Sequence, residues 1–355
     1  MILIVGAGIA GLAAALALEG FADVRVVERR RAADANAGAG IQLAPNAVAA
    51  LRAVGAADRV IAAAAQPDGL VVRSSNRRNP VGRLDYAVVA ERYGAPSLTA
   101  SRAALHGALL EEVEARGTIA VDYDVAATDA FHDGDDYWVQ GVEGLPELII
   151  AADGVGSTLR ASLVGDAEHD GGWVAWRGRG GAASGNVTEL IMSAGHHLVR
   201  YGLDAAEDNC VLVARYDRNP TGLSAGADDV TEWTSWPIRT RPEHVYHHGR
   251  VAFVGDAAHA MEPFLAQGAA MALEDAATLG AMVRRHGIGE AALAAYAAER
   301  VTRTERLARQ TRQQGSIYHF PLPLAIARDF AMERLGAEGI LSRVDWIYRW
   351  TPPQA

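Results

Sequence analysis

The start of the chain shows a regular succession of apolar runs around a glycine-rich turn. Residues 2–5, ILIV, form a continuous apolar run, as expected for a strand buried on both faces. An Ala/Leu-rich helical pattern follows the turn to about Glu19, and a second apolar run, VRVV at residues 24–27, ends at Glu28. This order of strand, turn, helix and strand predicts the opening of a Rossmann-like fold.

Further along, the same patterns predict a second sheet and a set of long helices. Four strand-like segments, separated by Gly, Asn and Asp turns, favour a mostly antiparallel sheet: GGWVAWRGRG, TELIMSAG, HHLVRYGL and NCVLVARYD. Residues 267–286 and 290–314 are expected to form long helices, and residues 322–350 one or two amphipathic helices. The expected fold class is α/β, with a Rossmann-like domain, an inserted, mostly antiparallel β-sheet domain and C-terminal helices.

Composition and charge narrow the function classes. The 355 residues suit two domains or one domain with a large insertion. A formal net charge of −10, in a chain without lysine, disfavours a nucleic-acid binder. Cys210 is the single cysteine, which excludes an internal disulfide and a cysteine-rich metal site. The first strand is expected at Ile2, and no apolar run reaches the roughly 18 residues of a membrane span. No signal peptide or membrane segment is therefore predicted, and the expected location is the cytoplasm.

The turn GAGIAG, residues 6–11, has the spacing of a dinucleotide-binding fingerprint. Gly6 permits the tight turn, Gly8 lets the backbone approach a pyrophosphate, and Gly11 lets the helix pack closely on the strand. The helix N-terminus presents free N–H groups to the phosphates. Glu28 follows Gly8 by 20 residues and is expected to bind ribose hydroxyls. The fingerprint alone does not separate FAD from NAD, but Glu28 would repel the 2′-phosphate of NADP.

Two later motifs indicate a flavin site. LIIAADGVGSTLR, residues 148–160, carries an apolar strand that ends at Asp153-Gly154, and GRVAFVGDAAHAMEP, residues 249–263, carries another that ends at Gly255-Asp256. Ligands of open α/β sheets gather beyond the carboxyl ends of strands. The GxGxxG, DG and GD motifs, in this order and spacing, resemble the class A flavoprotein aromatic hydroxylases, the p-hydroxybenzoate hydroxylase group. The closer resemblance is to the branch of salicylate hydroxylase, 3-hydroxybenzoate 6-hydroxylase and 6-hydroxynicotinate 3-monooxygenase.

The resemblance covers nearly the whole chain and implies both domains and FAD contacts. AGIQLAPNAVAALRAVG (39–55) resembles the flavin-contacting loop of that branch, SRAALHGAL (101–109) its pyrophosphate-binding segment, WVAWRG (173–178) its first substrate-domain strand, and RVDWIYRW (343–350) its C-terminal ending. The expected FAD-binding domain is discontinuous, over residues 1–72, 98–168 and 246–325. The substrate domain takes residues 73–97 and 169–245, and residues 326–355 form a C-terminal helical segment. The implied FAD contacts are Gly6, Gly8, Ile9, Ala10, Gly11, Glu28, Arg29, Gln42, Arg102, Val125, Asp153, Asp256, Pro263, Gly268, Ala269 and Ala270.

The chain departs from the branch at two residues and in two segments. Ala260 follows His259 where the branch has proline, and Ala266 stands where the loop before a long helix begins with glycine. Neither change removes a charge or a needed side chain. The segments at about 178–195 and 217–231 are shorter than in the branch, which affects the expected shape of the substrate pocket and not the flavin site.

His197 and Tyr201 are the candidate catalytic residues. In GHHLVRYGL, residues 195–203, strand periodicity places these two side chains on one face and Arg200 on the other, where a structural pair is expected. The related hydroxylases show a histidine and a tyrosine at this spacing on a strand facing the flavin. The resemblance therefore implies that they hold a substrate hydroxyl and help to deprotonate it, because a phenolate reacts better than a phenol with an electrophilic flavin hydroperoxide. The alternative is a histidine and a tyrosine satisfied within an ordinary sheet.

The implied activity is that of an FAD-dependent, NAD(P)H-consuming monooxygenase. It would hydroxylate a phenolic or heteroaromatic small molecule through a C4a-hydroperoxyflavin formed with O2. FAD would be tightly bound and NAD(P)H transient, since the chain has no second glycine fingerprint; NADH and NADPH both stay open, and Arg160 is a candidate contact for this cofactor. No nucleic acid or membrane is expected as a partner, and the protein would be a monomer or a homodimer. The alternatives are epoxidation or Baeyer–Villiger oxidation of a natural product, and a non-catalytic flavin-binding protein.

The remaining histidines and acids favour a scaffold over a metal site. In HVYHHG, residues 244–249, no carboxylate has ligand spacing, so a surface loop is expected. In GDAAHAMEP, Asp256 is expected to bond ribityl hydroxyls, His259 to shape the turn and Glu262 to be peripheral; no metal site is predicted. The backbone of QGAA, residues 267–270, opens a helix that would stabilise the negative charge of reduced flavin at its N1–C2=O edge. Candidates for the pocket wall are Trp173, Trp176 and Tyr216.

Overall fold

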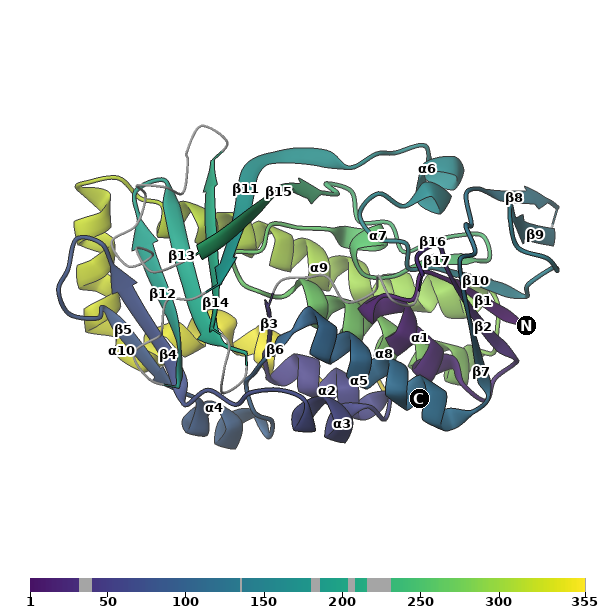
Figure 1. Cartoon of the computed structure of the whole chain (residues 1–355), viewed down its shortest axis with the longest axis horizontal. Coiled ribbons are helices and arrows are strands. Elements are labelled where there is room, and N and C mark those ends of the chain that lie inside the picture. The colour runs from purple at the N-terminus through teal and green to yellow at the C-terminus, as the bar shows by residue number, and fades with distance from the viewer. Residues whose placement is uncertain (32–39, 135, 180–185, 204–207, 216–230, 355) are drawn as a thin grey trace.

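Two β-sheets lie toward opposite ends of the molecule, with long helices running between them (Figure 1). The computed structural model describes residues 1–31, 40–134, 136–179, 186–203, 208–215 and 231–354. One sheet has six strands in the order β16-β17-β10-β1-β2-β7, and the other has seven in the order β15-β11-β14-β13-β12-β4-β5. The predicted α/β class, with a Rossmann-like sheet and a second sheet, is confirmed.

The six-stranded sheet holds the parallel strands that the apolar runs predicted. The parallel strands are β1 (Ile2–Val5), β2 (Val24–Glu28), β7 (Ile119–Tyr123), β10 (Leu148–Ala151) and β17 (Val251–Phe253). The short β16 (His247–His248) pairs antiparallel with β17 at one edge. Every residue of β1 and β10 is buried, which explains why their sequences are continuously apolar.

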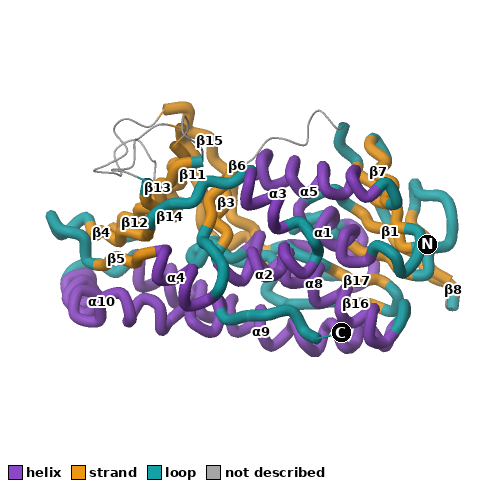
Figure 2. Tube along the Cα trace, turned by 90° about the horizontal axis from the view of Figure 1, so that it is seen from below, coloured by secondary structure: helices purple, strands orange, loops and turns teal. Residues whose placement is uncertain are grey.

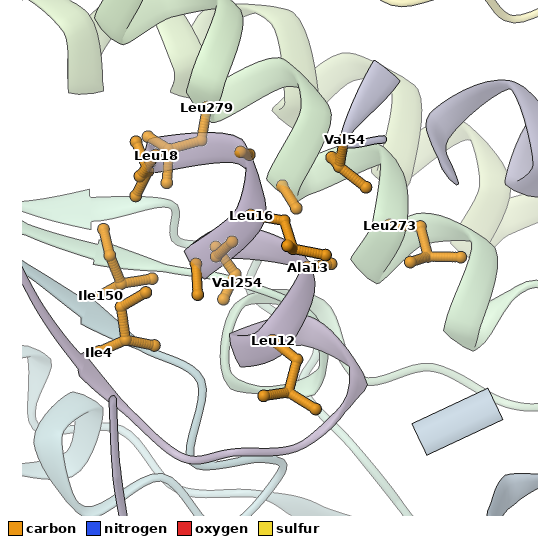
Figure 3. Packing of buried hydrophobic residues seen from close by; sticks show 14 of the residues in the cluster. Ile4, Leu12, Ala13, Leu16, Leu18, Val54, Ile150, Val254, Leu273 and Leu279 are labelled. Atoms are coloured by element: carbon orange, nitrogen blue, oxygen red, sulfur yellow. The ribbon is translucent and has the colours of Figure 1, made fainter. Parts of the chain in front are cut away.

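The main hydrophobic core joins this sheet to α1 (Ile9–Leu18) and α8 (Gly268–His286) (Figure 3). The cluster includes Leu12 and Leu16 of α1, Leu273 of α8 and Ile4 of β1, all labelled in this view. The two helices approach closely because position 280 is glycine: a Cβ there would lie 2.7 Å from the carbonyl oxygen of Ala17. The Ala-rich composition of α1 therefore serves tight helix packing on the strand that carries the glycine turn.

The seven-stranded sheet is mostly antiparallel, as predicted. Its strands are β4 (Gly69–Ser74), β5 (Gly82–Asp85), β11 (His169–Arg179), β12 (Val187–Ser193), β13 (His196–Gly202), β14 (Asp208–Arg215) and β15 (Thr231–Thr240). Among the described pairings of this sheet, only that of β12 with β4 is parallel. β15 was not predicted because it contains Pro237, which cannot donate to a ladder; as an edge strand it tolerates the proline.

The long helices among the remaining elements agree with the predicted helical segments. The other elements are β3 (Gly40–Leu43), β6 (Leu98–Ser101), β8 (Ala130–Asp133), β9 (Asp136–Val139), α2 (Pro45–Ala53), α3 (Ala57–Ala62), α4 (Tyr86–Tyr93), α5 (Arg102–Arg116), α6 (Thr158–Val164), α7 (Asp256–His259), α9 (Glu290–Tyr318) and α10 (Leu324–Tyr348). α8, α9 and α10 match the predicted helical segments, and the backbone of α10 is non-helical at Gly336.

Of the two long C-terminal helices, α9 connects the sheets and α10 lies against the second one. α9 contacts β16 of the first sheet, and its last residue, Tyr318, packs against a buried cluster of the second that includes Met192. Figure 2 shows the course of α9 along the molecule. α10 runs beside β5 at the far edge of the second sheet. β4 begins at Gly69, before the expected domain boundary after residue 72, and the domain division itself stays a prediction. None of the helices in the described ranges has the length and apolarity to cross a membrane.

Candidate active site

The glycine turn has the geometry that a phosphate requires. Gly6 has a φ of 105°, and a Cβ there would lie 2.5 Å from the carbonyl oxygen of Ala152, so only glycine fits. A Cβ at Gly8 would meet nothing within 4 Å, so the space beside this residue is open. The carboxylate of Glu28 accepts a hydrogen bond from the amide of Ala7 at 3.0 Å. The turn therefore brings open space, a helix N-terminus and an acid together.

Four more of the predicted FAD contacts lie on neighbouring elements. Arg29 directly follows β2 and is exposed, and Arg102 is exposed at the first position of α5. Gln42 lies in β3, which pairs with β6. The amide of Val125 donates to the carbonyl oxygen of Glu28 at 3.0 Å, so this residue adjoins the end of β2. Both guanidinium groups are accessible to a ligand.

The DG motif presents an acceptor that the described chain does not use. Oδ2 of Asp153 accepts hydrogen bonds from the amides of Thr158 (3.0 Å) and Leu159 (3.4 Å). Oδ1 is buried and has no hydrogen-bond partner among the described residues, and burial raises the pKa of Asp153. Buried acceptors are normally satisfied, so a ligand hydroxyl fits this oxygen. The carboxylate of Asp256, at the start of α7, is exposed.

The loop before α8 ends in a set of free amides. The first hydrogen bond within α8 runs from the amide of Met271 to the carbonyl oxygen of Gln267 at 2.9 Å. The amides of Gly268, Ala269 and Ala270 precede it and have no acceptor within the helix. Pro263 and Gly268 are exposed, and a Cβ at Gly268 would meet nothing within 4 Å. With the glycine turn and Asp153, these amides fit the expected flavin.

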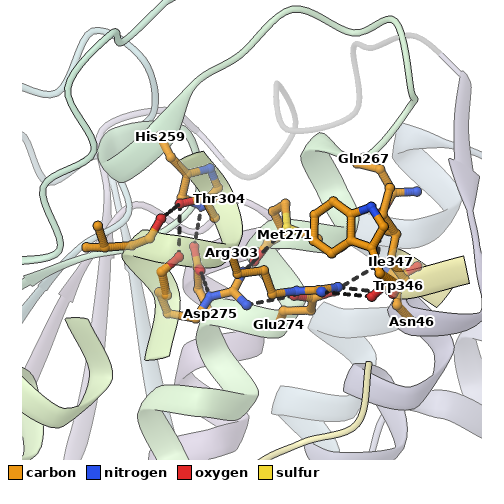
Figure 4. Close-up of polar contacts among 12 residues, drawn as sticks. Asn46, His259, Gln267, Met271, Glu274, Asp275, Arg303, Thr304, Trp346 and Ile347 are labelled. Atoms are coloured by element: carbon orange, nitrogen blue, oxygen red, sulfur yellow. Dashed lines mark hydrogen bonds and ion pairs between the residues drawn. The ribbon is translucent and has the colours of Figure 1, made fainter. Parts of the chain in front are cut away.

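A buried polar network supports this helix N-terminus (Figure 4). Nδ2 of Asn46 donates to Oε1 of Gln267 at 2.9 Å and to Oε1 of Glu274 at 2.8 Å. Glu274 also accepts from Arg300 at 2.6 Å and from Arg303 at 2.6 Å. The network ties the residue before α8 to α2 and α9, so the free amides are held in a fixed position.

Asp275 connects the same network to the GD motif. Its carboxylate accepts from the amide of Gly255 (2.8 Å), from Nε2 of His259 (2.6 Å) and from Nε of Arg300 (2.7 Å). Burial alone would raise the pKa of Asp275, but His259 and Arg300 lower it below its ordinary value. His259 therefore does more than shape the turn, because it pairs with a buried acid. Glu262 is partly exposed, and its carbonyl oxygen accepts from Thr311.

His197 and Tyr201 lie on one face of β13, and both are buried. The ring of His197 lies 5.7 Å from that of Phe264, which follows Pro263. Its Nδ1 is 2.9 Å from Nε2 of His319, and burial, followed by the charges of the neighbouring histidines, holds the pKa of His197 well below its ordinary value. The imidazole is therefore neutral at physiological pH.

Tyr201 lies at the opposite end of the same strand face. A Cβ at Gly40, the first residue of β3, would lie 2.7 Å from the ring and from the hydroxyl of Tyr201. Asn209 is the partner of Tyr201 in the register of β13 and β14, and Oδ1 of Asn209 accepts from Nε of Arg177 at 3.0 Å. Burial raises the pKa of Tyr201, so its hydroxyl keeps its proton.

A small cavity of about 30 Å³ lies between the second sheet and two segments that are expected to contact the flavin, β3 and the loop before α8. Gln42 of β3 and residues 265–267 line it on one side, and Thr188 of β12 on another. Thr188 is adjacent to Glu189, the register partner of Arg200, and so lies level with Tyr201 and on its side of the sheet. The cavity therefore adjoins the face that carries His197 and Tyr201.

The family of the chain follows from comparison with known proteins. Residues 1–178 and 206–311 match the family described as FAD binding domain. The chain belongs to this family. Two of its relatives are the 3-hydroxybenzoate 6-hydroxylase of Polaromonas naphthalenivorans (strain CJ2), 30% identical with 98% of this chain and 96% of the relative covered, and the 6-hydroxynicotinate 3-monooxygenase of Pseudomonas fluorescens, 30% identical with 87% and 89% covered.

Solved structures show the same fold. A Klebsiella pneumoniae HpxO variant complexed with FAD has a TM-score of 0.84 at 24% identity, over 98% of both chains. A salicylate hydroxylase substrate complex has a TM-score of 0.79 at 21% identity, over 98% of this chain and 95% of the other. The family match and the sequence relatives confirm the predicted class, an FAD-dependent monooxygenase of the aromatic-hydroxylase type, for which NAD(P)H and O2 are the typical co-substrates.

Two pocket and cofactor predictions for this monooxygenase are wrong. Trp173 shares the face of His197, but Trp176 packs with Leu198 on the opposite face of the sheet and cannot line the same pocket; Tyr216 lies outside the described residues. Arg160 is fully buried, and its guanidinium donates to Asp166 and to backbone carbonyls, including that of Ala257 at 2.9 Å. All its donors are used, so it cannot contact a nicotinamide cofactor.

The histidines of residues 244–249 are not in a surface loop. His247 and His248 form β16, and Nδ1 of His244 lies 3.0 Å from the hydroxyl of Thr304. Burial lowers the pKa of His244 to about 3. Within the described ranges, no group of three or more His, Cys, Asp or Glu residues could hold a metal ion.

Four residues that support this flavoprotein site were not predicted from the sequence: His319 and the buried Glu274, Asp275 and Arg300. Glu274 and Asp275 interrupt an otherwise apolar stretch of α8, and this interruption was the available signal for the ion network. His319 gave no such signal, because it contacts His197 across 122 positions of the chain.

Proposed function

We propose that this monooxygenase hydroxylates a small phenolic or heteroaromatic substrate beside the face of β13 that carries His197 and Tyr201. One observation carries the proposal: this face spans the two segments expected to flank the flavin. His197 packs against Phe264, beside Pro263, and Tyr201 packs against Gly40 at the start of β3. The two side chains are four positions apart along the strand, about 13 Å, which is longer than one aromatic ring.

The two side chains have complementary chemical roles in this proposal. His197 is neutral, so its imidazole can accept a hydrogen bond or a proton from a ring hydroxyl. Tyr201 keeps its proton, so its hydroxyl can donate to a substrate oxygen or ring nitrogen. Bound FAD would supply the activated oxygen. Raising the electron density of the ring is the contribution of the protein, because ring hydroxylation is an electrophilic attack.

The predicted FAD contacts belong to the same proposal. Gly6, Gly8, Ile9, Ala10 and Gly11 would hold the pyrophosphate, with Arg102 reaching it from α5. The ribose and ribityl hydroxyls would meet Glu28, Asp153 and Asp256. The amides of residues 268–270 would stabilise negative charge on the reduced flavin. The cytoplasm, which supplies NAD(P)H, is the proposed location, with the protein as a monomer or homodimer.

A substrate panel tests the proposed function. The names of three relatives suggest suitable compounds: 3-hydroxybenzoate, 6-hydroxynicotinate and 3-amino-4-hydroxybenzoate. The purified enzyme, with FAD, is expected to oxidise NADH or NADPH faster when one member of the panel is present. With ¹⁸O₂, the product should carry one labelled oxygen on the ring.

Two outcomes would count against the proposal. If no phenol or hydroxypyridine accelerates NAD(P)H oxidation, the hydroxylase assignment is wrong. If oxygen is inserted into a carbon–carbon bond or across a double bond, the Baeyer–Villiger or epoxidation alternative replaces it.

A further inference from the structure

A second histidine lies directly behind the predicted catalytic one. Nδ1 of His197 and Nε2 of His319 are 2.9 Å apart, and the ring centroids lie 5.1 Å apart with a tilt of 33°. This distance is that of a hydrogen bond. No hydrogen bond to Nε2 of His197 occurs among the described residues, so this nitrogen remains available to a ligand.

The position of His319 is fixed from several sides. It follows α9 as the C-cap, and its amide donates to the carbonyl oxygen of Gly315 at 3.2 Å. Arg328 caps the same helix end, because it donates to the carbonyl oxygens of Ile317 and Tyr318 at 3.0 and 2.8 Å. The ring of Trp173 lies 4.7 Å from the His319 ring. Such packing leaves the ring little freedom to turn away from His197.

The contact between the two rings permits two arrangements of protons. A neutral imidazole carries one proton, so in each ring one nitrogen donates and the other accepts. If His197 donates from Nδ1, its Nε2 is an acceptor and His319 carries its proton on Nδ1. If His319 donates from Nε2, the pattern is reversed in both rings. The two arrangements have the same charge and differ only in where the protons lie.

We propose that His197 and His319 form a proton relay that takes the proton of the substrate hydroxyl away from the ring-hydroxylation site. The proposal rests on the function proposed above. The substrate O–H bond breaks, its electron pair stays on oxygen, and the proton binds Nε2 of His197. The proton on Nδ1 of His197 passes to Nε2 of His319, and the proton on Nδ1 of His319 passes to a water molecule. Both rings end neutral, and the reverse sequence returns a proton to the product.

The surroundings of the two rings favour passing a proton on over holding it as an imidazolium. The titratable and charged groups around the pair are Arg215 beside Trp173, Arg328 of α10 and Tyr318, with His196 on the opposite face of β13. Burial, with the charges of His196, Arg215 and Arg328, lowers the pKa of His319 to about 4. An imidazolium is therefore unfavourable in either ring. A proton that enters at His197 has to leave at His319.

The far nitrogen of the pair supplies an independent observation. Nδ1 of His319 is buried and has no hydrogen-bond partner among the described residues. Buried polar atoms without a protein partner are usually satisfied by ordered water. A water molecule at Nδ1 would complete the relay. In this arrangement His319 is a positioning and relay residue, and His197 remains the group that touches the substrate.

Two substitutions at His319 distinguish the effect of its hydrogen bond to His197 from the effect of passing a proton on. His319→Gln keeps an amide near the position of Nε2 but cannot pass a proton on, and His319→Phe removes both properties. His196→Gln is the matched control, because His196 is buried in the same strand and points to the opposite face. All three holoenzymes are expected to bind FAD, as measured from flavin absorbance.

The kinetic readout is hydroxylation of the best phenolic substrate from the panel. His319→Gln and His319→Phe should lower kcat about 100-fold, the lower range for losing a proton-transfer group, with KM changed less than threefold. The solvent deuterium isotope effect on hydroxylation and its dependence on pH should both change in these variants. The relay would be overturned if both His319 variants kept the wild-type kcat, isotope effect and pH profile. It would also be overturned if His196→Gln lowered kcat as much as the His319 variants do.

A second readout needs no turnover. In ¹⁵N-histidine NMR spectra of the holoenzyme, the ¹⁵N chemical shifts of Nδ1 and Nε2 report which nitrogen of His197 carries the proton. These shifts should change in His319→Phe. Unchanged His197 shifts would overturn the proposal. If the wild-type enzyme hydroxylates no phenol, the proposed function fails, whereas these spectra still decide whether the two rings share a proton.

Discussion

Ala266 holds a backbone conformation that alanine seldom adopts. Its φ is 52°, and it stands in the loop that leads to the free amides of α8. A left-handed conformation costs an L-residue about 1–2 kcal/mol relative to glycine. Ala266→Gly is therefore expected to stabilise the protein by about 1 kcal/mol in urea unfolding monitored by circular dichroism.

The matched control for this substitution is Ala297→Gly. Ala297 lies within α9, where glycine costs about 1 kcal/mol relative to alanine. The two substitutions should therefore shift the unfolding midpoint in opposite directions. A destabilised Ala266→Gly variant would mean that strain at this position is not the controlling factor.

Tyr201→Phe tests the other half of the proposed chemistry. The substitution removes one hydroxyl from a buried ring that packs on Gly40 and leaves the packing itself in place. Product formation is expected to fall about 100-fold while FAD stays bound and NAD(P)H oxidation continues with release of hydrogen peroxide. Mass spectrometry of the product measures hydroxylation, and the peroxide yield measures the NAD(P)H oxidation that forms no product.

Tyr93→Phe serves as the control for this loss. Tyr93 donates to Asp345 at 2.9 Å, outside the face of β13 that carries the candidate residues. Its removal should leave the ratio of product to NAD(P)H unchanged. Full product formation by Tyr201→Phe would exclude Tyr201 from the chemistry.

At the scale of elements, glycine at position 315 lets α9 approach closely to Phe264, in the loop that precedes α8. A Cβ at Gly315 would lie 2.5 Å from two ring atoms of Phe264. Gly315→Ala should therefore displace Phe264 and its neighbour Pro263, weaken FAD binding and reduce the yield of product per NAD(P)H. Fluorescence titration of the apoprotein with FAD measures the first effect.

A second helical glycine gives the opposite expectation. A Cβ at Gly107 of α5 would meet nothing within 4 Å, so Gly107→Ala should stabilise the protein by about 1 kcal/mol through helix propensity alone. Equal effects of the two substitutions on stability and on FAD affinity would show that contact with Phe264 is unimportant.

The ion network under α8 is expected to respond strongly to loss of Arg300. Arg300→Met leaves buried Asp275 without an arginine partner, hydrogen-bonded among the described residues only to His259 and the amide of Gly255, and leaves Glu274 with Arg303 and Asn46. Removing one member of a buried ion pair costs about 3–5 kcal/mol. The variant should unfold at a lower urea concentration and release FAD more readily. Adding Asp275→Asn should recover part of the loss; a purely additive double variant would mean that the two groups do not interact.

The elements that the sequence predicted are those with local signals. The glycine turn, α8 and α9 have strong periodicity or a spaced motif, and each lies at its expected place. β15 carries a proline, and its pairing with β11 is a tertiary contact that no local pattern encodes. The relation of His197 to His319 is likewise set by how α9 ends against the second sheet, so neither residue's neighbours in sequence reveal it.

At the scale of the whole molecule, the two sheets contribute different parts of one site. The six-stranded sheet places Asp153 and the glycine turn beyond the carboxyl ends of parallel strands. The seven-stranded sheet presents His197 and Tyr201 from the other side. α9 joins them, because its Arg300 anchors the α8 network while its C-cap, His319, reaches His197. Flavin support and proton transfer therefore depend on a single helix.

This arrangement predicts how stability depends on pH. The folded protein holds His197, His244 and His319 with pKa values below the ordinary value of about 6.5, at about 4 for His319 and about 3 for His244. The unfolded chain therefore binds more protons below pH 6.5, so the stability that these residues contribute is present above that pH and is lost as the pH falls toward 4. The melting temperature should drop between pH 7 and pH 5 at constant ionic strength.

Substitution of these histidines should flatten the pH dependence. Each buried histidine can contribute a slope of up to about 1.4 kcal/mol per pH unit, so His319→Gln should lose less of its own stability between pH 7 and pH 5 than the wild type does. His132→Gln, at an exposed position of β8, is the matched control for replacing a histidine with glutamine. Differential scanning calorimetry across this range measures both variants. An unchanged slope in His319→Gln would mean that His319 is protonated in the folded protein, in conflict with its burial beside Arg215 and Arg328.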